Sequence, residues 1–134
     1  MSNETVELVR AIYDAFAAGD IAGVVGRMDP GIVWNEAENY LYADGNPYCG
    51  PEAILGGVFA RLGSEWDGFA AVPEEFLDAG DTVVVLGHYR GTFKATGKAV
   101  EAQLVHVWRL DEGKAAEFQQ YTDTLQFARA TGRG

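Results

Sequence analysis

The chain has 134 residues, of which 48% are hydrophobic and 22% are charged. A chain of this size and composition can bury an apolar core, which excludes a disordered protein and predicts a single domain over residues 1–134. Its 20 acidic and 10 basic residues give a net charge of −10, and a field of this sign repels nucleic acids and anionic lipid surfaces. We therefore expect no nucleic acid and no membrane as partners.

The sequence shows no features of a targeting segment. No apolar run approaches the ~18 residues that a membrane helix needs. The first residues, Met1 to Glu4, lack the basic and apolar regions of a secretory signal. The single cysteine, Cys49, excludes an intramolecular disulfide and fits a reducing compartment. We therefore expect a cytoplasmic protein.

Apolar spacing predicts a mainly helical first half. In residues 4–18 apolar side chains recur every three or four positions, which is typical of an amphipathic helix. Asp20 is placed as the N-cap of a second, short helix, which carries Met28 and ends at Pro30-Gly31. A strand is predicted over Ile32–Glu36, followed by a long loop. Pro51 then suits the first position of a third helix.

The second half of the chain has the composition of β-strands. Four such runs cover residues 69–78, 82–93, 99–110 and 115–122. Short turns that contain glycine separate them, and connections this short join antiparallel neighbours. Pro73 has no N–H to donate, so the first run is predicted at an edge or a bulge. This order of elements predicts an α+β fold in which helices cover one face of a curved antiparallel sheet.

Several well-known catalytic and binding motifs are missing. The sequence has no G-x-S-x-G segment, and Gly91 to Lys98 departs from a phosphate-binding loop in its spacing and in the residue after the lysine. No pairs of cysteine and histidine have the spacing of a zinc site. We therefore predict neither a metal nor a cofactor.

Alternation along the predicted strands groups ionisable and polar side chains with apolar ones. Four sets share a face: Leu86 with His88, Leu104 with His106 and Trp108, Trp34 with Glu36, and Phe118 with Gln120. Alternation alone does not decide which face of each strand points inward. A mostly apolar pocket with a few convergent polar groups is typical of a small-molecule site, so we expect a small hydrophobic molecule as the partner.

A set of short segments, in one order over almost the whole chain, resembles a known family. These segments are Ala17-Ala18-Gly19-Asp20-Ile21, residues 29–34, Tyr48-Cys49-Gly50-Pro51, Asp78-Ala79-Gly80-Asp81 with residues 83–87, His106-Val107-Trp108-Arg109, and Gln120-Tyr121-Thr122-Asp123-Thr124. Together they are similar to the SnoaL-like and ketosteroid-isomerase-like branch of the NTF2-like superfamily. The resemblance implies a cone, in which a strongly curved, mostly antiparallel sheet wraps around three N-terminal helices and leaves a pocket at its open end.

The resemblance also suggests catalytic positions. It places Glu36 where ketosteroid isomerase has its carboxylate base, and His106 where that enzyme has a protonated aspartic acid in its oxyanion hole. The family's tyrosine on the first helix falls on Ile12, next to Tyr13, so the pattern departs from the family there. A carboxylate in an apolar pocket has a raised pKa and histidine titrates near neutrality, so the two side chains suit acid–base chemistry. His88 is the candidate for a second donor.

Structural interpretations compete with these roles. Glu36 also fits a solvated strand end, and His106 also fits a hydrogen-bonded core residue. Asp123 fits the N-cap of a final helix over Thr124–Ala130 better than an acid–base role. The side chains expected to line the pocket are Tyr13, Phe16, Trp34, Tyr48, Phe59, Leu62, Leu86, Leu104, Trp108, Phe118 and Gln120.

Two classes of function remain open at this stage. The first is a cofactor-independent enzyme that uses acid–base catalysis, as an isomerase, a polyketide-cyclase-like enzyme, or a hydratase or epoxide-hydrolase-like enzyme. The second is a non-catalytic small-molecule binding module or a dimeric interaction domain. An apolar outer sheet face, which we expect to carry Val83, Val85, Val105 and Val107, predicts a homodimer.

Overall fold

One curved, six-stranded sheet organises the chain, in the order β2-β1-β6-β5-β4-β3. The computed structural model describes residues 2–133. The strands are β1 (Met28–Asn35), β2 (Tyr48–Cys49), β3 (Trp66–Ala79), β4 (Thr82–Phe93), β5 (Ala99–Asp111) and β6 (Lys114–Thr122). Strands β3 to β6 form the predicted antiparallel meander, while β1 pairs in parallel with β6 and antiparallel with β2.

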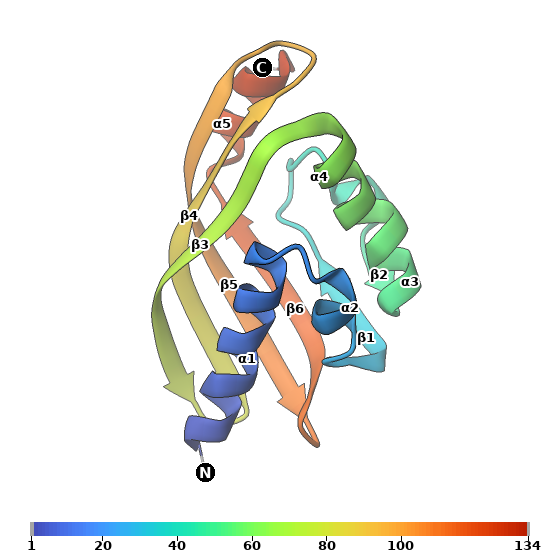
Figure 1. Ribbon diagram of the computed structural model, residues 1–134, viewed down its shortest axis with the longest axis vertical. Coiled ribbons are helices and arrows are strands. Elements are labelled where there is room, and N and C mark those ends of the chain that lie inside the picture. Colours follow the sequence, from blue (N-terminus) through green and yellow to red (C-terminus); the bar gives the residue numbers. More distant parts are fainter. Residues whose placement is uncertain (1, 134) are drawn as a thin grey trace.

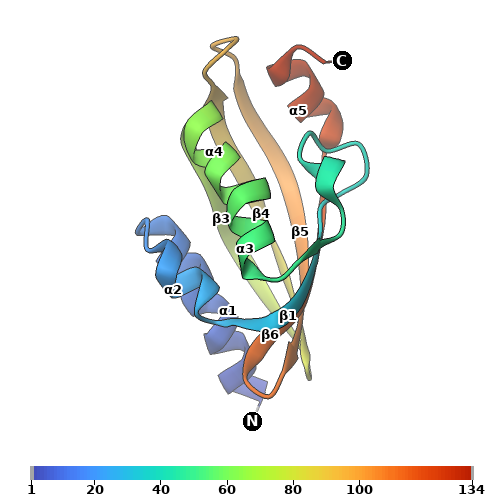
Figure 2. The ribbon, with the colours of Figure 1, turned by 90° about the vertical axis from the view of Figure 1, so that its right-hand side faces the viewer.

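The helices form two groups against this sheet. They are α1 (Ser2–Ala17), α2 (Ile21–Val25), α3 (Pro51–Ile54), α4 (Ala60–Glu65) and α5 (Thr124–Thr131), with a short 3₁₀ turn, η1, over Ala43–Gly45. A π-helical segment, η2 (Leu55–Phe59), joins α3 to α4, so these pieces make one rod. Figure 1 shows α1 crossing in front of the sheet, with α5 at the opposite end from the N-terminus. Figure 2 shows the α1–α2 pair and the α3–α4 rod on the same side of the sheet.

Local chemistry explains where these helices begin. The Asp20 carboxylate accepts a hydrogen bond from the backbone N–H of Gly23 at 2.9 Å, which confirms the predicted N-cap of α2. Pro51 occupies the first turn of α3, as predicted. Asp123 stands at the N-cap position of α5, but its exposed side chain makes no capping hydrogen bond. The predicted α+β fold is confirmed.

Pro73 lies in an edge strand at an irregularity. Strand β3 is at one end of the sheet, and its register with β4 shifts between Pro73 and Glu75. Both features agree with the prediction for a residue that lacks an N–H. The shift bends a long strand, and it belongs to the curvature that lets the sheet enclose the helices.

The inward face of β4 is opposite to the predicted one. Val83, Val85 and Tyr89 are buried, whereas Leu86 and His88 are on the other, partly exposed face. Both faces of this strand carry apolar residues in its first half, so hydropathy alone did not distinguish them. The expected pocket positions of Leu86 and His88 are therefore wrong.

The composition of the expected outer face changes for the same reason. Val83 and Val85 belong to the core, where both are fully buried, and do not lie on the outer face. The outward neighbours of Val105 and Val107 on β4 are Leu86 and Val84, which pair with them directly in the sheet register. The apolar outer face is therefore formed by Val84 and Leu86 of β4, in place of Val83 and Val85, together with Val105 and Val107 of β5.

Two classes of feature are absent from the described residues. Across residues 2–133, every helix is too short or too polar to cross a bilayer. No three side chains of histidine, cysteine, aspartate or glutamate lie close enough together in that part of the chain to hold a metal ion.

Candidate active site

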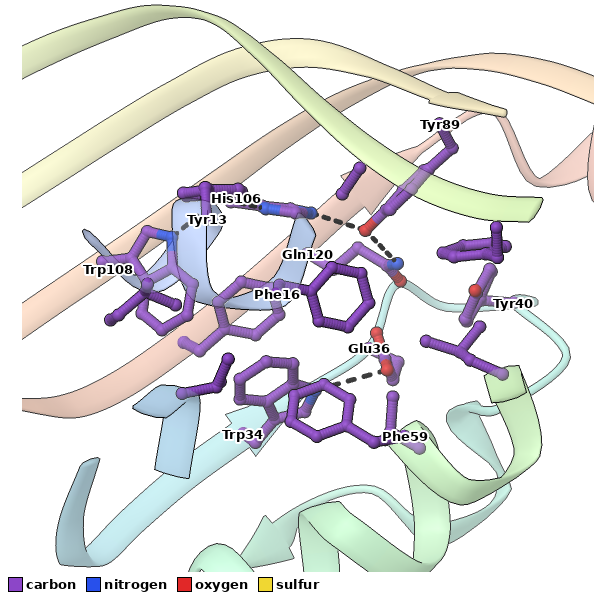
Figure 3. Close-up of a pocket in the computed structure, with 17 residues that line it drawn as sticks. Tyr13, Phe16, Trp34, Glu36, Tyr40, Phe59, Tyr89, His106, Trp108 and Gln120 are labelled. Atoms are coloured by element: carbon purple, nitrogen blue, oxygen red, sulfur yellow. Dashed lines mark hydrogen bonds between the residues drawn. The ribbon is translucent and has the colours of Figure 1, made fainter. Parts of the chain in front are cut away.

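A cavity of about 60 Å³ lies between the sheet and the helices. It has room for roughly four to six water-sized positions, by the space that a buried water needs. Figure 3 shows its wall of aromatic rings, interrupted by a few polar groups. The lining residues are Ile12, Tyr13, Phe16, Val24, Trp34, Glu36, Tyr40, Val58, Phe59, Leu62, Phe69, Ala71, Tyr89, His106, Trp108, Phe118 and Gln120.

Glu36 is the buried carboxyl group of this cavity, and only 3% of the residue is exposed. It follows β1 directly and shares the inward face of that strand with Trp34, as predicted. The indole N–H of Trp34 donates to Glu36 Oε1 at 3.2 Å. The other carboxyl oxygen has no hydrogen-bond partner among the described residues.

Burial controls the ionisation of Glu36. Desolvation raises the pKa of its carboxyl group to about 8, although the Trp34 hydrogen bond and the positive charge of Arg61 both act to lower it. The group is therefore mostly protonated at pH 7 and mostly ionised above pH 8. Such a carboxyl group can donate a proton in one state and accept one in the other.

Side-chain hydrogen bonds, most of them to backbone groups of the loop, fix the conformation of the loop that follows β1. The Asn46 amide accepts from the Glu36 N–H at 2.9 Å and donates to the Glu36 carbonyl at 2.8 Å. The Tyr48 hydroxyl donates to the carbonyl of Tyr42 at 2.7 Å. The guanidinium of Arg61, on α4, donates to the Tyr48 hydroxyl oxygen at 2.8 Å. These contacts hold the backbone of Glu36, so its carboxyl group has a defined position.

Five side chains form a continuous hydrogen-bonded chain along the sheet side of the cavity (Figure 3). The indole N–H of Trp108 donates to the Tyr13 hydroxyl at 2.9 Å. Tyr13 contacts His106 Nδ1 at 2.5 Å, and Tyr89 contacts His106 Nε2 at 2.5 Å. At the end of the chain, Gln120 Nε2 donates to the Tyr89 hydroxyl at 2.8 Å.

These groups are neutral at ordinary pH. Burial lowers the pKa of His106 to about 3, so its imidazole is uncharged over the physiological range. Burial also raises the pKa of Tyr13, Tyr40 and Tyr89 above the usual value for a phenol. The three hydroxyl groups therefore keep their protons and serve as hydrogen-bonding groups.

The structure brings most of the predicted site residues together. Glu36 and His106 border the cavity, as do Tyr13, Phe16, Trp34, Phe59, Leu62, Trp108, Phe118 and Gln120. His106, however, has both ring nitrogens engaged by tyrosine hydroxyl groups. The expectation that His106 presents a nitrogen to a ligand does not fit this geometry.

Four predicted site residues lie outside the cavity. His88 is on the outer face of the sheet, where its Nδ1 is 3.0 Å from Glu74 Oε2, and Leu86 shares that face. Leu104 is buried on the inner face but does not reach the cavity. Tyr48 packs beneath the loop, and its ring lies against the backbones of Gly45 and Gly57.

Sequence reasoning missed several lining residues, including Tyr40, Phe69 and Tyr89. A signal for Tyr89 existed. Arg90 is a basic residue that belongs at the surface, and neighbouring side chains on a strand point in opposite directions. An outward Arg90 therefore places Tyr89 inward.

Comparisons with known proteins agree with this architecture. The NTF2-like protein of Burkholderia thailandensis E264 is 39% identical and superposes with a TM-score of 0.91, over 95% of this chain and 96% of that one. An NTF2-like protein of unknown function from Burkholderia pseudomallei K96243 is 27% identical, with a TM-score of 0.86 over 95% of this chain and 96% of that one.

A third similar structure was obtained in the presence of a small molecule. TerC, co-crystallised with polyporic acid, is 27% identical, with a TM-score of 0.85 over 96% of this chain and 98% of that one. No protein with curated annotation matches the chain significantly. Residues 9–118, which include Glu36 and the whole hydrogen-bonded chain except Gln120, match the family described as the SnoaL-like domain. This match covers most of the sequence, so the chain belongs to the SnoaL-like domain family, with an NTF2-like fold.

Proposed function

We propose that this protein binds a small, mostly apolar ligand with a carbonyl group in the cavity and transfers a proton on it through Glu36. The observation that carries the proposal is the position of Glu36, a buried carboxyl group with one free oxygen at the edge of an aromatic cavity. Membership of the SnoaL-like family and the TerC complex with polyporic acid support a small-molecule ligand.

The reaction needs no redox step. The ionised Glu36 removes a proton from the carbon next to the carbonyl, and the C–H electron pair forms a C=C bond while the carbonyl π pair moves to oxygen. The protonated Glu36 then returns the proton to the same carbon or to one farther along a conjugated system. Return to a different carbon is isomerisation, and attack of the intermediate on a second carbonyl is aldol cyclisation.

A small probe can test this chemistry without the natural substrate. Cyclohex-3-en-1-one has acidic protons between its carbonyl and its double bond, and its seven heavy atoms suit a cavity of about 60 Å³. We expect the protein to catalyse exchange of these protons in D₂O, followed by NMR, and conversion to the conjugated enone, followed by absorbance. The rate should rise with pH and level off above about pH 8, because the ionised carboxylate is the base.

Glu36→Gln is the decisive variant, because it keeps the shape of the side chain and removes the base. We expect it to lower the exchange rate by at least about 100-fold, in line with the usual contribution of a general base. Probe binding, followed through Trp34 and Trp108 fluorescence, should change only a few-fold. Glu38→Gln, at an exposed neighbouring position, is the matched control and should keep the full rate. Equal rates in the wild type and Glu36→Gln would contradict the proposal and favour the non-catalytic binding module.

We also propose that the protein forms a homodimer through the outer face of its sheet. Two cross-strand rows make this face apolar at its centre, Leu77–Val84–Val107 and Leu86–Val105–Tyr121. Two pairs of exposed opposite charges flank these rows, Arg90 with Glu101 and Arg109 with Glu117. A two-fold axis at the centre of this face would place the Arg90–Glu101 pair of one copy opposite the Arg109–Glu117 pair of the other copy.

A further inference from the structure

The hydrogen bonds around His106 have a direction that follows from counting protons. The indole N–H of Trp108 only donates, so the Tyr13 oxygen accepts it. The proton of Tyr13 then needs an acceptor of its own, and His106 Nδ1 lies 2.5 Å away. A neutral imidazole that accepts at Nδ1 carries its proton on Nε2, so His106 donates to Tyr89.

The opposite tautomer of His106 would leave the hydroxyl proton of Tyr13 beside aromatic rings, without an acceptor. If His106 Nδ1 carried the hydrogen, the Tyr13 oxygen would accept both from it and from Trp108. The Tyr13 proton would then have no acceptor among the described residues, since its other neighbours there are the rings of Phe76 and Trp108. Each tautomer thus leaves one phenol proton without an acceptor among the described residues, on Tyr13 or on Tyr89. Tyr89, unlike Tyr13, lies close enough to the Glu36 carboxyl group to interact with its charge, so the free proton is better placed on Tyr89 and the Nε2–H tautomer is favoured.

Gln120 adds a second donor to Tyr89. The backbone N–H of Ala37 donates to Gln120 Oε1 at 2.9 Å, which fixes the orientation of the amide. Gln120 Nε2 therefore faces Tyr89 and donates to its oxygen at 2.8 Å. With His106 Nε2–H and Gln120 Nε2–H both donating to it, the Tyr89 oxygen has two accepted hydrogen bonds and still carries its own proton.

The remaining proton of Tyr89 is the uncommitted donor of the network. It has no acceptor among the described residues, whereas the residue borders the cavity together with Glu36 and Tyr40. A hydroxyl that accepts two hydrogen bonds is also polarised to donate more strongly. Figure 3 shows the Tyr89 oxygen between His106 and Gln120, on the side of the cavity that leads to Glu36.

We propose that Tyr89 donates the hydrogen bond that holds the ligand's carbonyl oxygen, and that His106, Tyr13 and Gln120 are positioning residues that aim this proton. The proposal rests on the proposed function, in which the carbonyl oxygen gains negative charge as Glu36 removes the neighbouring proton. It specifies the ligand class as a ketone or enone, with its oxygen at Tyr89 and its acidic carbon toward Glu36.

The tautomer of His106 tests the direction of the network without any ligand. In the protein labelled with ¹⁵N-histidine, NMR should show one histidine, His106, as the neutral Nε2–H form throughout pH 5 to 8. In Tyr13→Phe the donor to Nδ1 is gone, so the preference for Nε2–H should be lost. A neutral Nδ1–H form in the wild type would overturn the proposal, because Tyr89 would then donate to His106. Retention of Nε2–H in Tyr13→Phe would overturn the positioning role of Tyr13.

A matched pair of ligands tests the contact with oxygen. Cyclohexanone and methylenecyclohexane have nearly the same shape, but only the ketone accepts a hydrogen bond. Tyr89→Phe should weaken cyclohexanone binding by roughly 3- to 10-fold, the usual worth of one neutral hydrogen bond, and leave methylenecyclohexane unchanged. Equal effects on both ligands would overturn the contact. Absence of proton exchange with an intact ketone preference would instead overturn the proposed function and leave Tyr89 as a binding residue.

Discussion

Glu36 makes the stability of the folded chain depend on pH in a direction opposite to that of most carboxyl groups. Its pKa rises from 4.5 to about 8 on folding, so between these values the folded state binds more protons than the unfolded state. The free energy of unfolding therefore falls as pH rises through this range. Most paired carboxylates, with lowered pKa values, have the reverse effect.

Replacing Glu36 with glutamine should remove this dependence. We expect Glu36→Gln to be more stable than the wild type at about pH 9, by on the order of 5 kcal/mol, with the difference shrinking toward pH 4.5. Urea unfolding of both proteins at several pH values measures this difference. Glu38→Gln, at an exposed position, should follow the wild type. Parallel curves for the wild type and Glu36→Gln would show that the carboxyl group is not buried as described.

Glu36 and His106 differ in how much of their role could be predicted from the sequence. The strand pattern put Glu36 on the same face as Trp34, and the family resemblance put it at the position of a catalytic carboxylate. His106 was placed correctly, but its role was not, because its two tyrosine partners are 93 and 17 residues away along the chain. Hydrogen-bond partners this distant depend on tertiary packing, which local patterns do not contain.

At the scale of elements, the rod from α3 to α4 depends on a close contact between a glycine and a tyrosine. A Cβ atom added at Gly57 would lie 2.1 Å from Cε1 of Tyr48, whereas one added at Gly56 would meet nothing within 4 Å. Both glycines belong to η2, which also carries Val58 and Phe59 of the cavity wall. Of these two adjacent glycines, therefore, only Gly56 has space for a larger side chain.

This difference predicts opposite effects for the same substitution. Gly57→Ala should destabilise the chain by about 1–3 kcal/mol, as overpacking does in a tight core. Gly56→Ala should be neutral or stabilise by up to about 1 kcal/mol, because alanine loses less backbone entropy in a helix. Thermal and urea unfolding of the two variants measure both effects. Equal stabilities would contradict the close packing of Tyr48 against Gly57.

Element types could be predicted better than their limits. The strands of the meander were expected within a few residues of their observed bounds, because glycine-containing turns separate them. The second helix was expected to continue to Pro30, but Met28 already begins β1. Met28 is buried in β1, and an apolar residue at this position also suits the buried face of a helix. Hydropathy therefore did not distinguish a longer helix from an earlier strand.

At the scale of the whole molecule, the sheet closes the cavity through a pairing that the local sequence does not indicate. Strand β1 runs parallel to β6, which places Trp34 opposite Phe118 and brings Glu36 next to the end of the meander. Short turns predict neighbours along the chain, but this pairing joins segments more than 80 residues apart. The family resemblance implied a curved, mostly antiparallel sheet, but it did not specify this pairing.

The outer face of the sheet gives the prediction that belongs to this scale. Leu86 lies at its centre, paired with Val105, whereas Leu125, an exposed leucine, lies on α5. We expect a dimer for the wild type in sedimentation at micromolar concentration, a monomer for Leu86→Lys, and a dimer for Leu125→Lys. A charge at Leu86 would be buried against its symmetry mate without a partner, which costs several kcal/mol. Raised salt should strengthen the wild-type dimer, because two chains of net charge −10 repel each other and salt screens this repulsion. A monomeric wild type at both salt concentrations would contradict the dimer and show that the apolar rows remain exposed to solvent.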